Sequence, residues 1–200
     1  MALLSASFAP ADRRRGVRRV AEAAILASAL LLVRGAGLAG QTVQAPEYQV
    51  KAVFLFNFAQ FVDWPAAAFA DSATPLVIGV LGDDPFEGFL DQTIRREQVR
   101  GRGFQVQRYH NVGEIKTCHI LFISRATGAR LDEVLANLRN RPILTVSDDA
   151  GFAERGGMIR FVTDQNRIRL QINLDAAQAA SLTVSSKLLR VADIVTPRGR

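Results

Sequence analysis

The stretch YQVKAVFLFNFAQFVDWP, residues 48–65, is rich in phenylalanine and contains the only tryptophan of the chain. Apolar residues recur in it at spacings of four and three, which places them on one helical face: Val50, Phe54, Phe58 and Phe61. Phe56 points the opposite way, so we expect the helix to be covered on more than one side. Pro65 ends the helix, because a residue before proline is pushed out of the helical region. The pattern predicts a helix over residues 47–63.

Residues 1–40 have the order of a secretory signal. A basic head with five arginines at positions 13–19 precedes an apolar core, Ala23 to Val33, and a small-residue tail, Gly35 to Gly40. The apolar core is too short to span a membrane, which requires about 20 residues. We expect cleavage after Ala39 or Gly40, with an uncleaved anchor or a misplaced start as the alternatives.

The net charge of +6 belongs mostly to this segment. Residues 1–40 contain six of the 25 Lys and Arg residues and two of the 19 Asp and Glu residues, which leaves 19 basic and 17 acidic residues after cleavage. The remaining net charge of +2 does not indicate a nucleic-acid partner. We expect residues 41–195 to form a single domain, which is a normal size for one core, and residues 196–200 to be a disordered tail.

Short apolar segments alternate with helical patterns along this domain. Strands are predicted at residues 76–81, 104–109, 120–124, 143–147, 158–163 and 167–174. Helices or helical turns are predicted at residues 85–94, 130–139, 149–155, 176–183 and 186–194. Asp164-Gln165-Asn166 indicates an antiparallel hairpin near the C-terminus. The expected fold is a three-layer α/β/α domain with a mostly parallel sheet and a C-terminal antiparallel hairpin.

Pairs of acidic residues follow two of the predicted strands, Asp83-Asp84 and Asp148-Asp149. Ligands bind at the carboxyl ends of strands in open α/β sheets, and four carboxylates there could hold a hard cation. A metal-dependent hydrolase is therefore one interpretation. The other, which we favour, is that these pairs cap turns and helix starts.

No catalytic pattern emerges from the remaining reactive residues. His110 and His119 lack a metal-ligand spacing, and no phosphate-binding glycine motif is present. We expect no enzymatic activity, no cofactor and no metal. Cys118 is the only cysteine, which excludes an intrachain disulfide. We expect it to be buried as a small apolar residue, with an interchain bond as the alternative.

Two groups of residues are candidates for binding a partner or ligand. Lys51, Asn57 and Trp64 belong to the aromatic helix, although Trp64 could simply pack in the core. Arg160, Arg167 and Arg169 lie on the hairpin, where the last two share a strand face. The alternative for the arginines is a solvated edge that discourages aggregation. Residues 185–192 are apolar enough to dock on the sheet or on a partner.

Several segments carry a family resemblance through their order and spacing. They are Tyr48-x-Val50-Lys51-Ala52 with Trp64-Pro65, then Ile78 to Gly82, Cys118 to Ser124, Ile143 to Asp148, Gly156-Gly157, Ile172 to Leu174 and Ser185 to Ala192. With these segments the chain resembles the YfiR family of exported bacterial regulators over residues 47–195.

The resemblance implies a non-enzymatic periplasmic protein that binds and represses an inner-membrane diguanylate cyclase, and so lowers cyclic di-GMP signalling and biofilm formation. Relatives can be dimers, and an outer-membrane lipoprotein can sequester such a repressor. Some relatives carry disulfides, which Cys118 alone cannot form within this chain. The rival interpretation is a periplasmic small-molecule binding module that feeds a sensor or a transporter.

Overall fold

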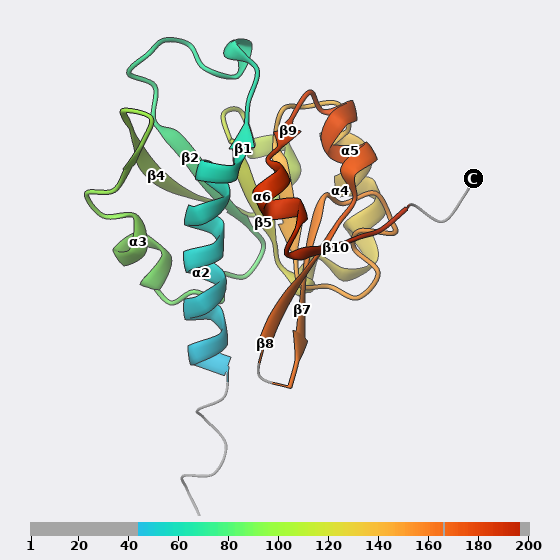
Figure 1. Cartoon of the computed structure of the whole chain (residues 1–200). Coiled ribbons are helices and arrows are strands. Elements are labelled where there is room, and N and C mark those ends of the chain that lie inside the picture. The colour runs from blue at the N-terminus through green and yellow to red at the C-terminus, as the bar shows by residue number, and fades with distance from the viewer. Residues whose placement is uncertain (1–43, 166, 197–200) are drawn as a thin grey trace, which may run out of the picture. The chain divides into compact units, whose positions relative to one another are not determined.

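The aromatic stretch forms α2, Gln44–Phe61, in the computed structural model, which describes residues 44–165 and 167–196 (Figure 1). Its buried face is lined by Ala52, Leu55, Phe58 and Ala59. The expectation that Val50 shares the face of Phe58 is wrong, because Val50 is 47% exposed. Steps of four residues drift around a helix with 3.6 residues per turn. Phe56 packs on Phe104, with ring centroids 5.3 Å apart, so a second side of α2 is covered as expected.

Eight strands within the described residues form one sheet in the order β10-β8-β7-β6-β5-β2-β4-β3. Their bounds are β2 Leu76–Leu81, β3 Gln98–Val99, β4 Arg102–Tyr109, β5 Ile120–Ile123, β6 Leu144–Ser147, β7 Ile159–Asp164, β8 Arg167–Ile172 and β10 Ala192–Ile194. Parallel pairing joins β4, β2, β5, β6 and β7, and β7 pairs antiparallel with β8. The predicted parallel sheet with a C-terminal hairpin is confirmed.

Helices cover both faces of this sheet. The shorter ones are α3 Phe89–Ile94, α4 Leu131–Leu138, α5 Leu174–Ala179 and α6 Ser186–Leu189. Ile120 and Phe122 of β5 belong to the core that contains α2, whereas Leu121 and Ile123 belong to the core that contains α4. Successive side chains of a strand point to opposite faces of the sheet. The arrangement is therefore three-layered, α/β/α, as the sequence predicts.

Residues 149–155 contain the predicted helical turn, in which the backbone N–H of Arg155 donates to the carbonyl of Gly151 at 3.0 Å. Two other predictions for the C-terminal part are wrong. The predicted helix over residues 176–183 ends at Ala179, and residues 183 and 184 belong to a strand. Of residues 186–194, only α6 is helical, and Ala192–Ile194 form β10, which pairs parallel with β8. A short apolar run fits either state, and the open side of β8 supplies the backbone partners that decide it. The strand β8 is consequently not an edge strand. The alternative role of its arginines, a solvated edge that discourages aggregation, therefore does not apply to this strand.

Two short strands, β1 Val62–Asp63 and β9 Thr183–Val184, pair antiparallel and join the end of α2 to the C-terminal part of the chain. The predicted signal segment, residues 1–40, and residues 197–200 of the predicted tail lie outside the described residues. The domain boundaries stay a prediction. Within residues 44–165 and 167–196, no helix combines the length and the apolar character needed to cross a membrane.

Candidate functional site

The carboxyl ends of the central parallel strands meet at one edge of the sheet. Gly82 follows β2, Ser124 follows β5 and Asp148 follows β6. β2 and β5 are neighbours in the sheet, and the connection after β2 leads to β4 on one side, whereas the connection after β5 leads to β6 on the other. Such a switch point is where ligands bind in open α/β sheets. This edge therefore holds the first candidate site.

A buried charge network ties α2 to this edge. The carboxylate of Asp148 accepts hydrogen bonds from three side chains: Lys51 Nζ at 2.5 Å, Tyr48 Oη at 2.8 Å, and Arg125 Nε and Nη2 both at 3.0 Å. Lys51 is 0% exposed and also contacts Glu47 at 2.5 Å. The network joins the first turns of α2 to the loops after β5 and β6, so it holds the helix in place on the sheet.

The pKa values of these groups show which of them are charged. Burial raises the pKa of Asp148, but the hydrogen bond and positive charge of Lys51 outweigh burial, and the pKa lies below its usual value. Burial, together with the hydrogen bond to Asp148, raises the pKa of Tyr48. At neutral pH Asp148 is therefore ionised, and Tyr48 is a neutral phenol that donates to it. A carboxylate with these donors is not available as a metal ligand.

The acidic pairs that follow the strands contact arginines and do not form a metal site. Asp84 accepts a hydrogen bond from Arg108 Nε at 2.8 Å, and Asp149 lies 4.0 Å from Arg155. Asp84 also accepts from the backbone N–H of Phe86 at 2.8 Å, which is the turn-capping role that we favoured. In the part of the chain that the structure describes, no group of three or more His, Cys, Asp or Glu side chains is placed to hold a metal.

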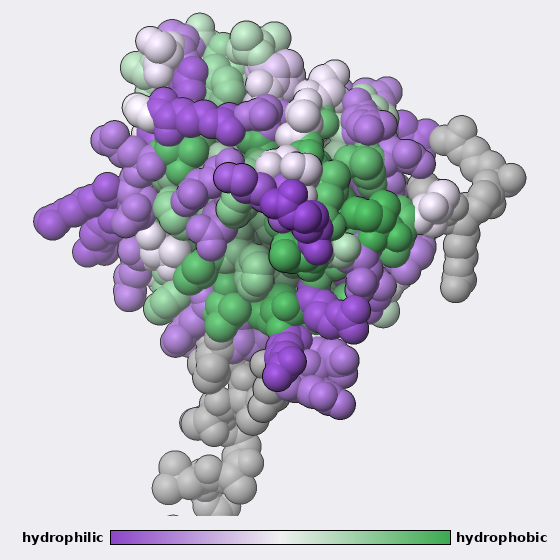
Figure 2. All heavy atoms as spheres, viewed as in Figure 1, coloured by the Kyte–Doolittle hydropathy of each residue, from purple (hydrophilic) through white to green (hydrophobic). Residues whose placement is uncertain are grey.

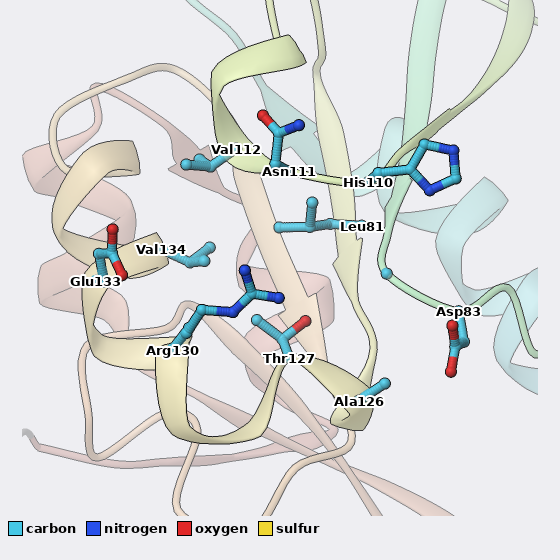
Figure 3. A pocket seen from close by; sticks show the side chains of 11 residues that line it. Leu81, Asp83, His110, Asn111, Val112, Ala126, Thr127, Arg130, Glu133 and Val134 are labelled. Carbon is cyan, nitrogen blue, oxygen red and sulfur yellow. The ribbon is translucent and has the colours of Figure 1, made fainter.

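A cavity of about 270 Å³ opens at the switch point (Figure 3). Its lining comes from the ends of β2 and β4, from the segment after β5 and from α4: residues 81–83, 110–112, 126, 127, 130, 133 and 134. In Figure 3 the guanidinium of Arg130 points into the middle of the cavity, near Thr127 and Val134. The side chains of His110 and Asp83 lie on the same side of it, apart from each other. The cavity therefore combines an apolar wall with a cation.

Sequence reasoning missed most of these residues. It placed Asp148 at the carboxyl edge, but it did not identify Tyr48, Arg125 or Arg130 as parts of a site. The available signal was a lysine inside an apolar helix, since a fully buried lysine requires an anionic partner. Which carboxylate serves as that partner depends on contacts across 97 residues of sequence.

The three candidates from the aromatic helix have separate positions. Lys51 belongs to the buried network, so it contacts Asp148 instead of solvent. Asn57 is partly buried on α2. Trp64 lies at the opposite, amino-terminal edge of the sheet, where its Nε1 donates to the carbonyl of His119 at 3.1 Å. The structure does not bring these three side chains into one site.

The three arginines of the hairpin also differ. Arg160 donates from Nη1 to Gln171 at 2.9 Å, and its buried Nε has no hydrogen-bond partner among the described residues. Arg169 is exposed and pairs with Asp193 of β10 at 3.0 Å. Arg167 is exposed and lies opposite Asp164 across the hairpin. Arg167 and Arg169 share a strand face, whereas Arg160 contacts the other strand of the hairpin.

Near Trp64, the amino-terminal edge of the sheet contains a buried histidine, His119. The backbone N–H of Val77 donates to Nδ1 of His119 at 3.0 Å, so Nδ1 is unprotonated. Nε2 therefore carries the proton and donates to the carbonyl of Ala68 at 3.2 Å. The ring stacks on Phe69 with centroids 4.5 Å apart. Burial lowers the pKa of His119, and the positive charge of Arg102 lowers it further. His119 is thus a neutral structural residue.

This histidine makes stability depend on pH. Below pH 6.5 the unfolded chain protonates His119, whereas the folded protein does not until its lower pKa is reached, so stability decreases as the pH falls through this window. The slope for one proton is at most about 1.4 kcal/mol per pH unit. Urea unfolding at several pH values between 7.5 and 5.5 measures this slope of the unfolding free energy against pH. Replacing His119→Gln should flatten this dependence, and an unchanged slope in the variant would contradict the assignment.

Cys118 is buried, as expected for a small apolar residue. Its Sγ lies 3.2 Å from the carbonyl of Ile120, and burial raises the pKa of the thiol to about 12. A thiol in this state is protonated and unreactive. A Cβ added at Gly79 would approach Sγ to 2.9 Å, so the neighbouring strand leaves no extra space there.

Exposed apolar side chains define a possible contact surface on the α2 side of the sheet. Val50 and Val53 of α2 are exposed, and so are Val191 and Ile194 next to and within β10, at 71% and 53%. Figure 2 shows apolar residues across the middle of this view, from α2 toward α6 and β10, with polar residues around them. Apolar patches with polar rims are typical of interaction surfaces. We call these four residues the apolar surface.

Comparisons with known proteins agree with the fold and identify the family. A solved structure, the ABC domain in complex with L-Trp from Streptococcus pneumonia, superposes with a TM-score of 0.50 at 11% sequence identity. The match covers 72% of this chain and 60% of that chain, and at this identity it shows the α/β fold alone. No curated protein matches the chain. The DUF4154 family, described as YfiR/HmsC-like, matches residues 48–193. This protein therefore belongs to the YfiR/HmsC-like family.

Proposed function

We propose that this protein is a periplasmic, non-enzymatic regulator that binds an inner-membrane diguanylate cyclase and holds it inactive. The family match over residues 48–193 is the observation that carries the proposal. A repressor of this kind works by contact, so it needs a surface that recognises a protein. The apolar surface supports the proposal, because Val50, Val53, Val191 and Ile194 are exposed although they are apolar.

Repression follows from differential binding. A regulator shifts its target toward the inactive state only by as much as it prefers that state, and each tenfold preference corresponds to about 1.4 kcal/mol. The buried network supports this role, because Lys51 and Asp148 hold the first turns of α2 in place. A surface that is already ordered before binding loses less entropy when the complex forms.

The residues predicted to contact a partner enter the proposal in different ways. Arg167 and Arg169 are exposed and remain proposed contacts, as does the partly buried Asn57. Lys51 would act through the position of α2. Arg160 and Trp64 are tied to protein groups by hydrogen bonds, so any effect of theirs on binding would be indirect. The proposal also includes a homodimer and release of the cyclase by an outer-membrane lipoprotein.

Deleting the gene is expected to raise cyclic di-GMP and biofilm formation, because the cyclase loses its repressor. Removing the target cyclase as well should cancel the effect. A protein with Val53→Glu should fail to restore repression, since burying an unpaired charge in the contact is strongly unfavourable. The matched control is Ala136→Glu, which places the same charge at an exposed position of α4 on the other face of the sheet.

Two outcomes would contradict the proposal. Unchanged cyclic di-GMP after deletion would show that no cyclase is repressed. Recovery of a sensor kinase or a transporter subunit with the tagged protein, and of no cyclase, would favour the rival binding module. Restoration by Val53→Glu as complete as by Ala136→Glu would exclude the apolar surface as the contact and leave the cyclase proposal intact.

A further inference from the structure

The cavity at the switch point has the position and size of a ligand site. The ends of β2 and β4 contribute to it through Leu81 and His110, and the segment after β5 contributes Ala126, so the cavity lies at the carboxyl edge where the strand order reverses. Its volume of about 270 Å³ is close to the lower limit of small-molecule sites in proteins. A ligand of roughly ten non-hydrogen atoms, not a large cofactor, suits this space.

Arg130 gives the cavity a cation. Figure 3 shows its guanidinium directed into the cavity. Two other arginines, Arg125 and Arg155, are bound by Asp148 and Asp132. Within the described residues Arg130 makes no ion pair, so its planar fork of donors is available to a ligand. Guanidinium groups bind carboxylates through two parallel hydrogen bonds.

The other residues that line the cavity further restrict which ligands can bind there. Leu81 and Val134 are buried apolar residues, and they form a wall beside the guanidinium. The hydroxyl of Thr127 lies near the guanidinium and can donate to the same anion. The carboxylates of Asp83 and Glu133 belong to the lining on opposite sides of Arg130. They repel a multiply charged anion such as phosphate more than a single carboxylate.

We propose that this cavity binds a small organic monocarboxylate, with its carboxylate on Arg130 and Thr127 and its apolar part against Leu81 and Val134. The site lies on the α4 side of the sheet, whereas the apolar surface lies on the α2 side. Its occupation therefore leaves the apolar surface free. The inference does not rest on the proposed function, because its test uses the purified protein alone.

Isothermal titration calorimetry with benzoate tests the site. We expect saturable binding at concentrations up to about 10 mM, and no binding of the neutral analogue benzamide. Arg130→Gln should weaken benzoate binding about tenfold or more, because a charge-assisted pair is lost. Thr127→Val should weaken it about threefold. The matched control, Arg139→Gln, removes an exposed arginine after the other end of α4 and should leave the affinity unchanged.

Amide NMR spectra of the titrated protein locate the ligand. Shifts confined to residues 81–83, 110–112 and 126–134 support the site. The proposal is overturned if benzoate does not bind, if Arg130→Gln binds it as well as the unaltered protein does, or if the shifts lie elsewhere. Inorganic phosphate that binds more tightly than benzoate would overturn the carboxylate assignment. Arg130 and Arg139 are both exposed, so neither replacement is expected to prevent folding.

Discussion

Replacing Asp148→Ala is expected to lower the free energy of unfolding by about 3–5 kcal/mol, the range found when one partner of a buried ion pair is removed. The variant leaves Lys51 fully buried, with Glu47 as its remaining anionic contact. Tyr48 and Arg125 lose their acceptor at the same time. Urea unfolding followed by the fluorescence of Trp64, the only tryptophan, measures the loss.

The matched control is an exposed ion pair between two strands of the sheet. Arg169 and Asp193 are 58% and 52% exposed, so Arg169→Gln should change stability by no more than about 0.5 kcal/mol. Comparable losses in Asp148→Ala and Arg169→Gln would contradict the role of the buried network. Lys51→Met is expected to fall between the two, because Asp148 then keeps the hydrogen bonds of Tyr48 and Arg125.

Replacing Phe161→Ala is expected to cost about 3–5 kcal/mol as well. Phe161 of β7 is 1% exposed, and its ring centroid lies 5.8 Å from that of Phe54 and 5.9 Å from that of Phe58. The variant removes this contact between the sheet and α2 and leaves a cavity that surrounding side chains fill only in part. The urea midpoint of the variant measures the loss.

A conservative replacement separates packing volume from aromatic contact. Phe161→Leu keeps most of the side-chain volume and should cost about 1.5 kcal/mol. Because Phe54 and Phe58 belong to the helix that carries Val50 and Val53, Phe161→Ala should also weaken repression in cells more than Phe161→Leu does. Equal losses of stability in the two variants would contradict a cavity as the cause.

The regular elements of the fold could be predicted where a local pattern suffices. The strand over residues 76–81 is present as predicted, because a continuous apolar run between turn residues fits a buried parallel strand. The C-terminal segment could not be assigned in the same way. Residues 192–194 are a strand only because β8 offers an unpaired side, and that side is created by residues 167–172.

The candidate site could likewise be predicted from the sequence only in part. The acid Asp148 could be placed at the carboxyl edge, since it directly follows a predicted strand. Its pairing with Lys51 could not, because the two residues are 97 positions apart and several other carboxylates were equally plausible partners. The role of Arg130 depends on a cavity formed by the ends of β2 and β4 and the segment after β5, and a sequence does not show empty space.

The sequence by itself determined the aromatic helix, the apolar strands and the three-layer architecture, because hydrophobic periodicity is a property of neighbouring residues. It also carried enough of the family pattern over residues 48–193 to identify the family. Only the tertiary structure decided that Lys51 is a buried partner of Asp148, that Val50 and Val53 face outward, and that Arg130 points into a cavity. Those properties arise from contacts between distant segments, which form only when the chain is folded.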